Sequence, residues 1–334
     1  MKTISVWLTH KDVSCWNITD EKIDILKQKL PDTEIIFCRN EEEFVSVLYK
    51  TEIAVIWIFK QEWFKKAPNI KIIITPAAGK DFFHVTPPEN VHTEYSSFHG
   101  KIMAETVLAM MLCHSRGISY LMRNKTVWPR TAMDKLMRQI RGSRITILGF
   151  GNIGIEIAKL SKNLGANIYG VKRTKISPPA FLEENDKIIL MDDFFKILPE
   201  TDHLAIALPG TKESTDIINR QVFTLLPEHA VIYNVGRGNA VNEEDLIYAL
   251  KTKEIAAAYL DVFKTEPLPE DSPLTDCPNC FIMPHASAIS PNYLDLFIDE
   301  FIEKYQKWAI GEMPSKKTEK RDTNLKNECR WKTF

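Results

Sequence analysis

The chain has 334 residues, a formal net charge of -1 and 44% apolar residues. This length favours two domains, and the apolar fraction together with the near-zero charge excludes a largely disordered chain. The same charge argues against electrostatic binding of nucleic acid, and no apolar run approaches the roughly 20 residues that span a bilayer.

The first third of the chain alternates apolar β-type runs with amphipathic segments. The expected strands are residues 4–8, 34–38, 53–58 and 71–75, and the expected helices are residues 20–30 and 41–49. Strands that alternate with helices predict a parallel sheet with helices on both faces.

A helical pattern at residues 100–122 is apolar almost all round, which predicts a buried helix. A polar, basic stretch follows at residues 123–141, and a second alternating region begins after it. Helices are expected there at residues 152–164 and 243–252, the latter with Asn242 as its N-cap. The expected strands are residues 144–148, 167–171, 203–208, 230–234, 255–260 and 280–283.

The last helical pattern, residues 293–309, is followed by too few residues for a further domain, so we expect it to return to the first sheet. Beyond Pro314 the tail is polar and basic, and we expect it to be loosely ordered or an extension that depends on a partner. The chain has six scattered cysteines, which indicate reduced thiols and a cytoplasmic protein. Cys277 and Cys280 form a C-x-x-C pair, but a zinc site needs a second pair of ligands at suitable spacing. We therefore predict no metal.

One glycine-rich segment lies between an expected strand and an expected helix and reads Gly149-Phe150-Gly151-Asn152-Ile153-Gly154. In this G-x-G-x-x-G pattern the first glycine makes a tight turn, the second lets the backbone approach a pyrophosphate, and the third lets the helix pack on the strand. The helix N-terminus then faces the anion. The motif alone is a weak signal, but its flanks fit on both sides, so we predict a dinucleotide site.

The next strand ends in Lys172-Arg173-Thr174-Lys175, where an NAD site usually has a carboxylate for the ribose 2′-hydroxyl. These cations suit a 2′-phosphate, because arginine binds phosphate bidentately. The pattern favours NADP over NAD, and the alternative is a solvated basic loop.

Four further segments follow strand ends, where open α/β sheets bind ligands. They are Ala77-Ala78-Gly79, Asn234-Val235-Gly236-Arg237-Gly238, the stretch from Asp261 through Glu266-Pro267, and Pro284-His285-Ala286-Ser287. With these motifs in order around the glycine segment, residues 1–312 resemble the D-isomer-specific 2-hydroxyacid dehydrogenases. Arg173-Thr174 resembles the NADPH-dependent glyoxylate/hydroxypyruvate reductase branch.

The resemblance implies a role for each matching residue. Arg237 would pair with the substrate carboxylate and polarise the 2-oxo group, His285 would be the general acid, and Glu266 would hold its imidazole. The backbone N–H groups of Ala78 and Gly79 would bind the substrate carboxylate. The cofactor would contact Gly149, Gly151, Asn152, Ile153, Gly154, Arg173, Thr174, Leu208, Pro209, Val235, Gly236, Asp261 and Ser287.

Some positions depart from the family pattern. The usual Gly-Ala-Gly reads Ala77-Ala78-Gly79, and Asp81 could be a helix N-cap instead of a ligand. The bulky Trp57 and Phe59 are unusual near a substrate mouth and leave the substrate open. The related formate dehydrogenases have Gln in place of Glu266, so that reaction is disfavoured.

The resemblance implies an α/β fold of two domains with parallel sheets. Residues 1–98 with 288–334 would form a discontinuous, flavodoxin-like substrate domain, and residues 99–287 a Rossmann dinucleotide-binding domain. The expected function is D-stereospecific hydride transfer between NADP(H) and a small 2-oxo or 2-hydroxy acid in a homodimer, with neither nucleic acid nor membrane as a partner. The alternatives are the same enzyme with NAD, or a dinucleotide-sensing protein like the corepressors that share this fold.

Overall fold

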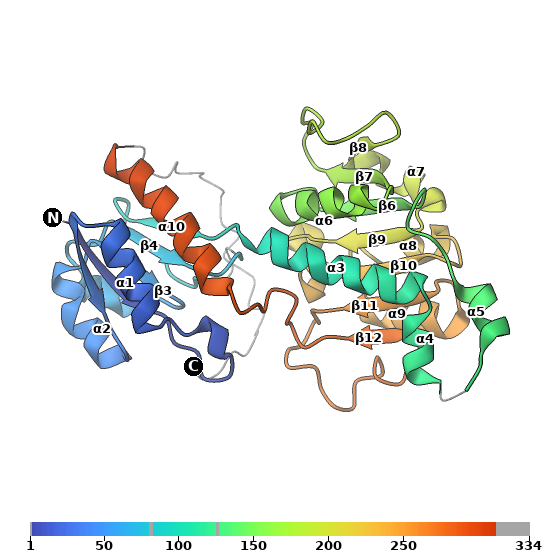
Figure 1. The fold of residues 1–334 in the computed structure, drawn as a ribbon, viewed down its shortest axis with the longest axis horizontal. Coiled ribbons are helices and arrows are strands. Elements are labelled where there is room, and N and C mark those ends of the chain that lie inside the picture. The colour runs from blue at the N-terminus through green and yellow to red at the C-terminus, as the bar shows by residue number, and fades with distance from the viewer. Residues whose placement is uncertain (1, 80–82, 125–126, 312–334) are drawn as a thin grey trace. The chain divides into compact units, whose positions relative to one another are not determined.

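The computed structural model describes residues 2–79, 83–124 and 127–311, so the expectations for Asp81 and for the tail beyond Pro314 lie outside the described residues. The chain divides into two compact units (Figure 1). One unit consists of the described residues up to His99 and those from Ile289 onward, and the other is Gly100–Ala288. None of the helices in the described part of the chain combines the length and the apolar character needed to cross a membrane.

The first unit contains a five-stranded sheet in the order β2-β1-β3-β4-β5, and every neighbouring pair is parallel. This is the flavodoxin-like strand order, and it confirms the predicted fold class. The strands are β1 (Lys2–Trp7), β2 (Thr33–Phe37), β3 (Ile53–Ile56), β4 (Ile72–Thr75) and β5 (His92–Tyr95). The sequence analysis missed β5, because its polar residues lie at the edge of the sheet.

Three helices cover this sheet: α1 (Asp20–Lys29), α2 (Glu41–Val47) and α10 (Tyr293–Ala309). The N-cap side chains of Thr19 and Asn40 accept hydrogen bonds from the first turns of α1 and α2. On α10, Lys304 donates a 2.7 Å hydrogen bond to the carbonyl of Tyr95 in β5. The last helix therefore returns to the first sheet, as predicted (Figure 1).

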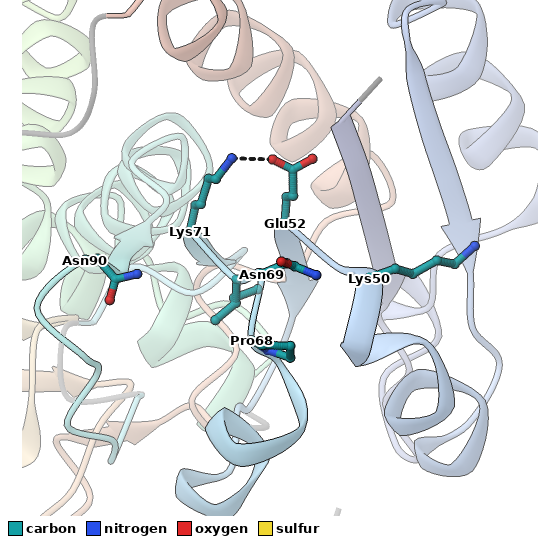
Figure 2. Close-up of a pocket in the computed structure, with 7 residues that line it drawn as sticks. Lys50, Glu52, Pro68, Asn69, Lys71 and Asn90 are labelled. Atoms are coloured by element: carbon teal, nitrogen blue, oxygen red, sulfur yellow. Dashed lines mark hydrogen bonds and ion pairs between the residues drawn. The ribbon is translucent and has the colours of Figure 1, made fainter.

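A pocket of about 320 Å³ lies where β3, β4 and β5 begin. The ammonium group of Lys71 lies 2.5 Å from the Glu52 carboxylate at this pocket, so the two charges neutralise each other (Figure 2). The lining residues are Lys50, Glu52, Pro68, Asn69, Ile70, Lys71 and Asn90. Ligands of open α/β sheets bind at the other edge, beyond the carboxyl ends of the strands.

The second unit contains a seven-stranded sheet in the order β12-β11-β10-β9-β6-β7-β8, again with parallel neighbours. Six of these strands follow the Rossmann order, with β12 added at one edge. The sequence analysis missed β8. The strands are β6 (Arg144–Leu148), β7 (Asn167–Lys172), β8 (Lys187–Leu190), β9 (His203–Ile206), β10 (Val231–Asn234), β11 (Ala257–Leu260) and β12 (Cys280–Ile282).

The expected helix at residues 100–122 is two helices, because Gly117 adopts a left-handed conformation with φ of 66° and ends the first. The predicted burial of this segment was correct for the first helix, since Ala104, Val107 and Met111 are completely buried. The helices of this unit are α3 (His99–Ser115), α4 (Ile118–Arg123), α5 (Arg130–Leu136), α6 (Asn152–Asn163), α7 (Phe194–Ile197), α8 (Arg220–Leu225) and α9 (Glu243–Thr252). The side chain of Asn242 caps α9, as predicted.

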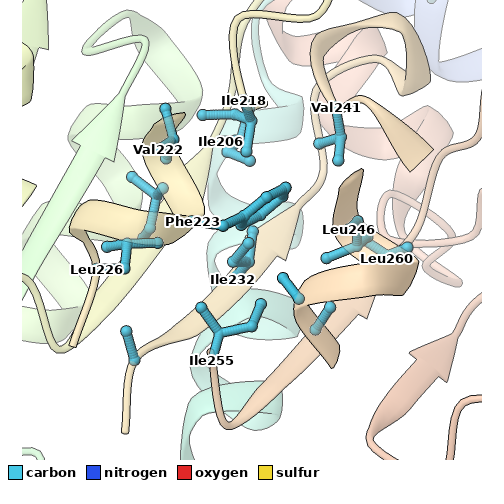
Figure 3. Close-up of a cluster of buried hydrophobic side chains, with 14 of the residues drawn as sticks. Ile206, Ile218, Val222, Phe223, Leu226, Ile232, Val241, Leu246, Ile255 and Leu260 are labelled. Carbon is cyan, nitrogen blue, oxygen red and sulfur yellow. The ribbon is translucent and has the colours of Figure 1, made fainter. Parts of the chain in front are cut away.

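Apolar clusters cover both faces of this sheet. Figure 3 shows one of them, in which Phe223 of α8 lies between Ile206 of β9, Ile232 of β10 and Leu246 of α9. In the other cluster, α3 contributes Val107 and Met111, and α6 contributes Ile157, among others. Burial of this kind fixes the strands, so the loops that leave their carboxyl ends start from rigid positions.

Candidate active site

The three motif glycines occupy different environments in the turn between β6 and α6. Gly149 has φ of +100°, and a Cβ there would lie 2.6 Å from the carbonyl oxygen of Ala207. A Cβ on Gly154 would lie 2.4 Å from the carbonyl oxygen of Gly149, whereas one on Gly151 would meet nothing within 4 Å. Gly149 and Gly154 are thus required by the fold. Gly151 leaves open space beside the N-terminus of α6, as a bound pyrophosphate would require.

Asn152 and Ile153 are the first residues of α6, so their backbone N–H groups belong to the first helical turn, where an anion is stabilised. Asn152 is exposed and Ile153 is half-buried. Their predicted contacts with the cofactor stay predictions.

The basic segment after β7 is exposed at Arg173 and Thr174. The Glu213 carboxyl has a lowered pKa. The causes, in order, are hydrogen bonds from its own backbone N–H and from Thr211, and then the charge of Arg173. The charge of Arg173 therefore acts on the loop after β9, which also contains Leu208 and Pro209. The predicted contacts of Arg173, Thr174, Leu208 and Pro209 with the cofactor stay predictions.

The turn that presents Arg237 leaves the end of β10 and is held by the buried side chain of Asn234. Asn234 accepts a 3.1 Å hydrogen bond from the N–H of Gly236 and donates one of 3.1 Å to the carbonyl of Arg237. The guanidinium of Arg237 donates a 2.9 Å hydrogen bond to the Gly236 carbonyl. Both ends of the turn are thus fixed before any ligand binds.

Gly238 brings this turn against the loop that carries Glu266. A Cβ on Gly238 would lie 1.9 Å from the carbonyl carbon of Phe263, so no other residue fits without movement of the backbone. The N–H of Phe263 in turn donates a 2.9 Å hydrogen bond to Oε1 of Glu266. The arginine turn and the glutamate loop are therefore packed as one structure.

The imidazole of His285 is bound by Glu266. Its Nδ1 lies 2.7 Å from Oε2 of Glu266. Burial by itself would raise the pKa of Glu266. The hydrogen bond and charge of His285, the Phe263 N–H and the charge of Arg237 outweigh that effect and leave the pKa below its usual value. Glu266 is thus a carboxylate at neutral pH that can stabilise a charged imidazole.

Asp261 fixes the backbone on which His285 stands. Its carbonyl accepts a 2.9 Å hydrogen bond from the His285 N–H, and its carboxylate accepts bonds of 2.6 Å and 3.1 Å from the N–H groups of Ala286 and Ser287. These bonds hold His285 at φ of 50°, in the left-handed region that non-glycine residues seldom adopt. The predicted contacts of Asp261 and Ser287 with the cofactor stay predictions.

The predicted carboxylate-binding residues belong to the other unit. The N–H of Ala77 bonds to the hydroxyl of Thr75 at 3.2 Å, and the Ala77 carbonyl accepts the Ser96 N–H at 3.0 Å. Ala78 is exposed and Gly79 is half-buried. Their predicted binding of the substrate carboxylate stays a prediction. None of the predicted site residues lines the pocket of Figure 2.

Trp57 and Phe59, the two bulky aromatic residues that the sequence singled out, pack against different rings. Phe59 is 1% exposed and packs on Trp63 and Phe64, so it belongs to the core. The ring of Trp57 packs against Trp16 and Tyr293.

The C-x-x-C pair forms no metal site that the structure shows. Cys277 and Cys280 are 2% and 3% exposed, and burial raises the pKa of Cys280 to about 12. Within residues 2–79, 83–124 and 127–311, no group of three or more His, Cys, Asp or Glu side chains could hold a metal ion.

Asn234 and Asn239 contribute to the site and were missed by the sequence analysis. Asn239 donates to the Thr211 carbonyl at 3.1 Å and to the Thr215 hydroxyl at 3.0 Å, which ties the loop after β9 to the arginine turn. An asparagine directly before Val-Gly-Arg-Gly at a strand end was the available signal for Asn234. The sequence carried no such signal for Asn239.

Comparison with known proteins identifies the family. The family model described as "D-isomer specific 2-hydroxyacid dehydrogenase, NAD binding domain" matches residues 108–287. The chain belongs to this family. It is an NAD(P)-dependent 2-hydroxyacid dehydrogenase, and the resemblance stated from the sequence is confirmed.

Two relatives of this dehydrogenase are named as reductases of hydroxypyruvate or glyoxylate. It is 32% identical over 236 residues to glyoxylate/hydroxypyruvate reductase B of Pectobacterium atrosepticum, covering 67% of this chain and 71% of the relative. It is 29% identical over 272 residues to hydroxypyruvate reductase of Blautia hydrogenotrophica, covering 78% and 80%. A solved D-isomer-specific 2-hydroxyacid dehydrogenase from Xanthobacter autotrophicus Py2, in complex with NADPH and MES, matches with a TM-score of 0.71. It is 25% identical, and the match covers 93% of this chain and 96% of that one.

Proposed function

We propose that this dehydrogenase reduces a small 2-oxo acid of the glyoxylate or hydroxypyruvate type to the D-2-hydroxy acid, with NADPH as the hydride donor. The observation that carries the proposal is the Glu266–His285 pair, 2.7 Å apart, on loops packed against the Arg237 turn. Hydride addition to a 2-oxo acid builds negative charge on an oxygen beside an existing carboxylate. A fixed cation and a positioned proton donor meet both needs.

Each residue of the proposed site has its own role in the reaction. The bound nicotinamide supplies the hydride. Arg237 pairs with the substrate carboxylate and polarises the 2-oxo group, and the N–H groups of Ala78 and Gly79 bind the same carboxylate. Because Nδ1 of His285 is committed to Glu266, the proton passes to the substrate oxygen from Nε2. The Glu266 carboxylate stabilises the imidazolium before the transfer.

The proposed preference for NADPH comes from the end of β7. Arg173 and Thr174 are exposed there, and this strand end lacks the carboxylate that would hold a ribose 2′-hydroxyl. The guanidinium of Arg173 would instead bind a ribose 2′-phosphate, in a charge-assisted and bidentate contact. The NADPH in the related solved structure is consistent with this proposal.

Steady-state assays test the proposal. Oxidation of NADPH and of NADH is followed with glyoxylate, hydroxypyruvate, pyruvate and bulkier 2-oxo acids. We expect the highest kcat/KM for NADPH with glyoxylate or hydroxypyruvate. Chiral analysis of the product from hydroxypyruvate or pyruvate should give the D-isomer, whereas the product from glyoxylate is achiral. Failure to oxidise either cofactor with any of these acids would refute the proposed function, and a preference for NADH would refute the cofactor assignment.

The proposed assembly is a homodimer in the cytoplasm. Several apolar side chains of α4 and the end of α5 are exposed, among them Leu121 at 44%, Met122 at 82% and Leu136 at 42%. Several large apolar side chains exposed on two consecutive helices are consistent with a protein interface. Sedimentation equilibrium should give the mass of a dimer, and Leu121→Glu should shift it toward the monomer. A monomeric wild type would refute the assembly.

A further inference from the structure

Tyr293, the first residue of α10, links two segments that are far from it in the sequence. Its hydroxyl lies 2.8 Å from Nε2 of His99 and donates a 3.3 Å hydrogen bond to the carbonyl of Pro76. A hydroxyl has one proton, so it accepts from the His99 N–H while it donates to Pro76. All three residues belong to the first unit, and Tyr293 and His99 are 3% and 4% exposed.

Aromatic rings hold the Tyr293 side chain in place. The ring of Phe98 meets it edge-on, with 4.8 Å between ring centroids. Trp16 and Trp57 pack at 5.8 Å and 6.1 Å. A ring packed on three sides keeps its hydroxyl in one position, so the bond to Pro76 needs no reordering when a substrate binds.

Pro76 begins the segment that we call the cradle loop, residues 76–79, which contains the proposed carboxylate-binding N–H groups. Other bonds secure the residues at the start of this loop. Ser96 donates a 3.0 Å hydrogen bond to the Thr75 carbonyl, and its N–H bonds to Ala77. The Pro76 carbonyl has Tyr293 as its donor, and the direction of that carbonyl sets the peptide plane that leads to Ala77.

The same helix also holds the segment through which the chain leaves the first unit. The Glu300 carboxylate accepts hydrogen bonds of about 2.9 Å from the backbone N–H groups of Ser97 and Phe98. His99 is the last residue before the chain leaves the first unit, and Tyr293 lies just after the chain returns to it at Ile289. One helix thus fixes both the cradle loop and the outgoing segment.

We propose that Tyr293 is a positioning residue that orients the cradle loop for the substrate carboxylate through its bond to Pro76. The proposal rests on the proposed function, because the loop's role in binding 2-oxo acids is part of that function. Tyr293 acts through the backbone and touches neither the hydride nor the transferred proton. Its removal should therefore weaken substrate binding much more than it slows the chemical step.

Tyr293→Phe tests this, because it keeps the ring and removes the hydroxyl. We expect KM for the 2-oxo acid to rise about tenfold, which corresponds to about 1.4 kcal/mol, with kcat changed less than twofold and the Kd of NADPH unchanged. His99→Gln keeps an N–H donor at a similar distance and should lose less affinity than His99→Leu. An unchanged KM, or an equal loss in kcat and cofactor affinity, would overturn the proposal.

Tyr233→Phe is the matched control. Like Tyr293, Tyr233 is buried and hydrogen-bonded to a histidine, with its hydroxyl 3.0 Å from Nδ1 of His203, but it lies in the interior of the second unit. We expect it to lower the thermal midpoint and to leave KM for the acid unchanged. A rise in KM equal to that of Tyr293→Phe would show that general loss of stability explains both.

Hydrogen exchange gives a readout that does not need turnover. The Ala77 and Ala78 amides should exchange faster in Tyr293→Phe than in the wild type, with no change at the turn around Arg237. If the wild type turns over no 2-oxo acid but exchange at the cradle loop responds to the substitution, the proposed function fails while the positional role of Tyr293 stands. No change in exchange would refute that role, whatever the activity.

Discussion

His285 and Glu266 are joined by a 2.7 Å hydrogen bond between Nδ1 and Oε2, and Oε1 of the same carboxylate accepts the N–H of Phe263. Both carboxylate oxygens are therefore occupied, and the imidazole is held in one orientation. Because the pKa of Glu266 is lowered, the pair contains a carboxylate throughout the neutral range.

Glu266→Gln should lower kcat for reduction by about 10²-fold, in the range of one general acid–base contribution. Because the pKa of Glu266 is lowered, the wild type should lose rate only in acid, where this carboxylate takes up a proton, and the variant should lack that acid limb. The pH profile of kcat measures both effects. Glu243→Gln is the control, because Glu243 also accepts a backbone N–H, from Lys264, but lies outside the proposed site. An unshifted profile would contradict the role of Glu266.

Arg173→Ala should raise KM for NADPH at least tenfold and leave KM for NADH nearly unchanged. The reason is that the guanidinium is expected to meet only the 2′-phosphate, in a charge-assisted bond of about 1.5–3 kcal/mol. Arg173→Lys keeps the charge without the bidentate geometry, so its KM for NADPH should lie between those of the wild type and Arg173→Ala. A preference for NADPH that survives Arg173→Ala would refute this assignment.

Alanine at two motif glycines should separate folding from cofactor binding. In Gly154→Ala the new Cβ would lie 2.4 Å from the Gly149 carbonyl, so the thermal midpoint should fall by several degrees. In Gly151→Ala the Cβ meets nothing within 4 Å, so the protein should melt like the wild type while its Kd for the cofactor rises at least tenfold. Calorimetry and fluorescence titration check this pair. Normal cofactor affinity in Gly151→Ala would exclude close approach of the pyrophosphate.

His203 should make the protein less stable in acid. It is 6% exposed, and burial lowers its pKa to about 4. The unfolded chain takes up a proton near pH 6.5 and the folded protein does not, so this contribution is complete above pH 6.5 and is lost progressively toward pH 4. At pH 5 the loss is about 2 kcal/mol. Urea unfolding at pH 7.5 and pH 5 should show a smaller pH effect in His203→Gln, although that variant is less stable at pH 7.5. An equal pH effect in both proteins would contradict the assignment.

Cys277 and Cys280 should resist alkylation in the folded protein. Both are buried, and burial raises the pKa of each thiol, so little thiolate is present at pH 8. Mass spectrometry after iodoacetamide should show these two residues unmodified until urea is added. Rapid labelling in the native state would contradict their burial.

The sequence by itself determined the family and the order of the chemical groups. The glycine motif, the arginine turn and the histidine each follow an apolar run, and in a parallel sheet such runs end at one edge. This placed Arg237, Glu266 and His285 on loops at the carboxyl ends of strands in the second sheet. Local patterns also gave the bounds of α10 and β6. One buried face gives α10 its helical spacing of apolar residues, and burial of four consecutive residues gives β6 its short, mostly apolar run.

Tertiary structure decided what depends on contacts between distant residues. The polar edge strand β5 forms because a neighbouring strand supplies its hydrogen bonds, and no apolar pattern marks it. The other edge strand, β8, has three apolar residues in a row, but so short a run does not distinguish a strand from a helix until its pairing with β7 is known. The role of Gly238 depends on the carbonyl of Phe263, and that of Tyr293 on His99 and Pro76, which are 194 and 217 residues away in sequence. A composition or a spacing carries no information about such pairs, because hydrogen bonds and close packing act over a few ångströms in space and are indifferent to separation along the chain.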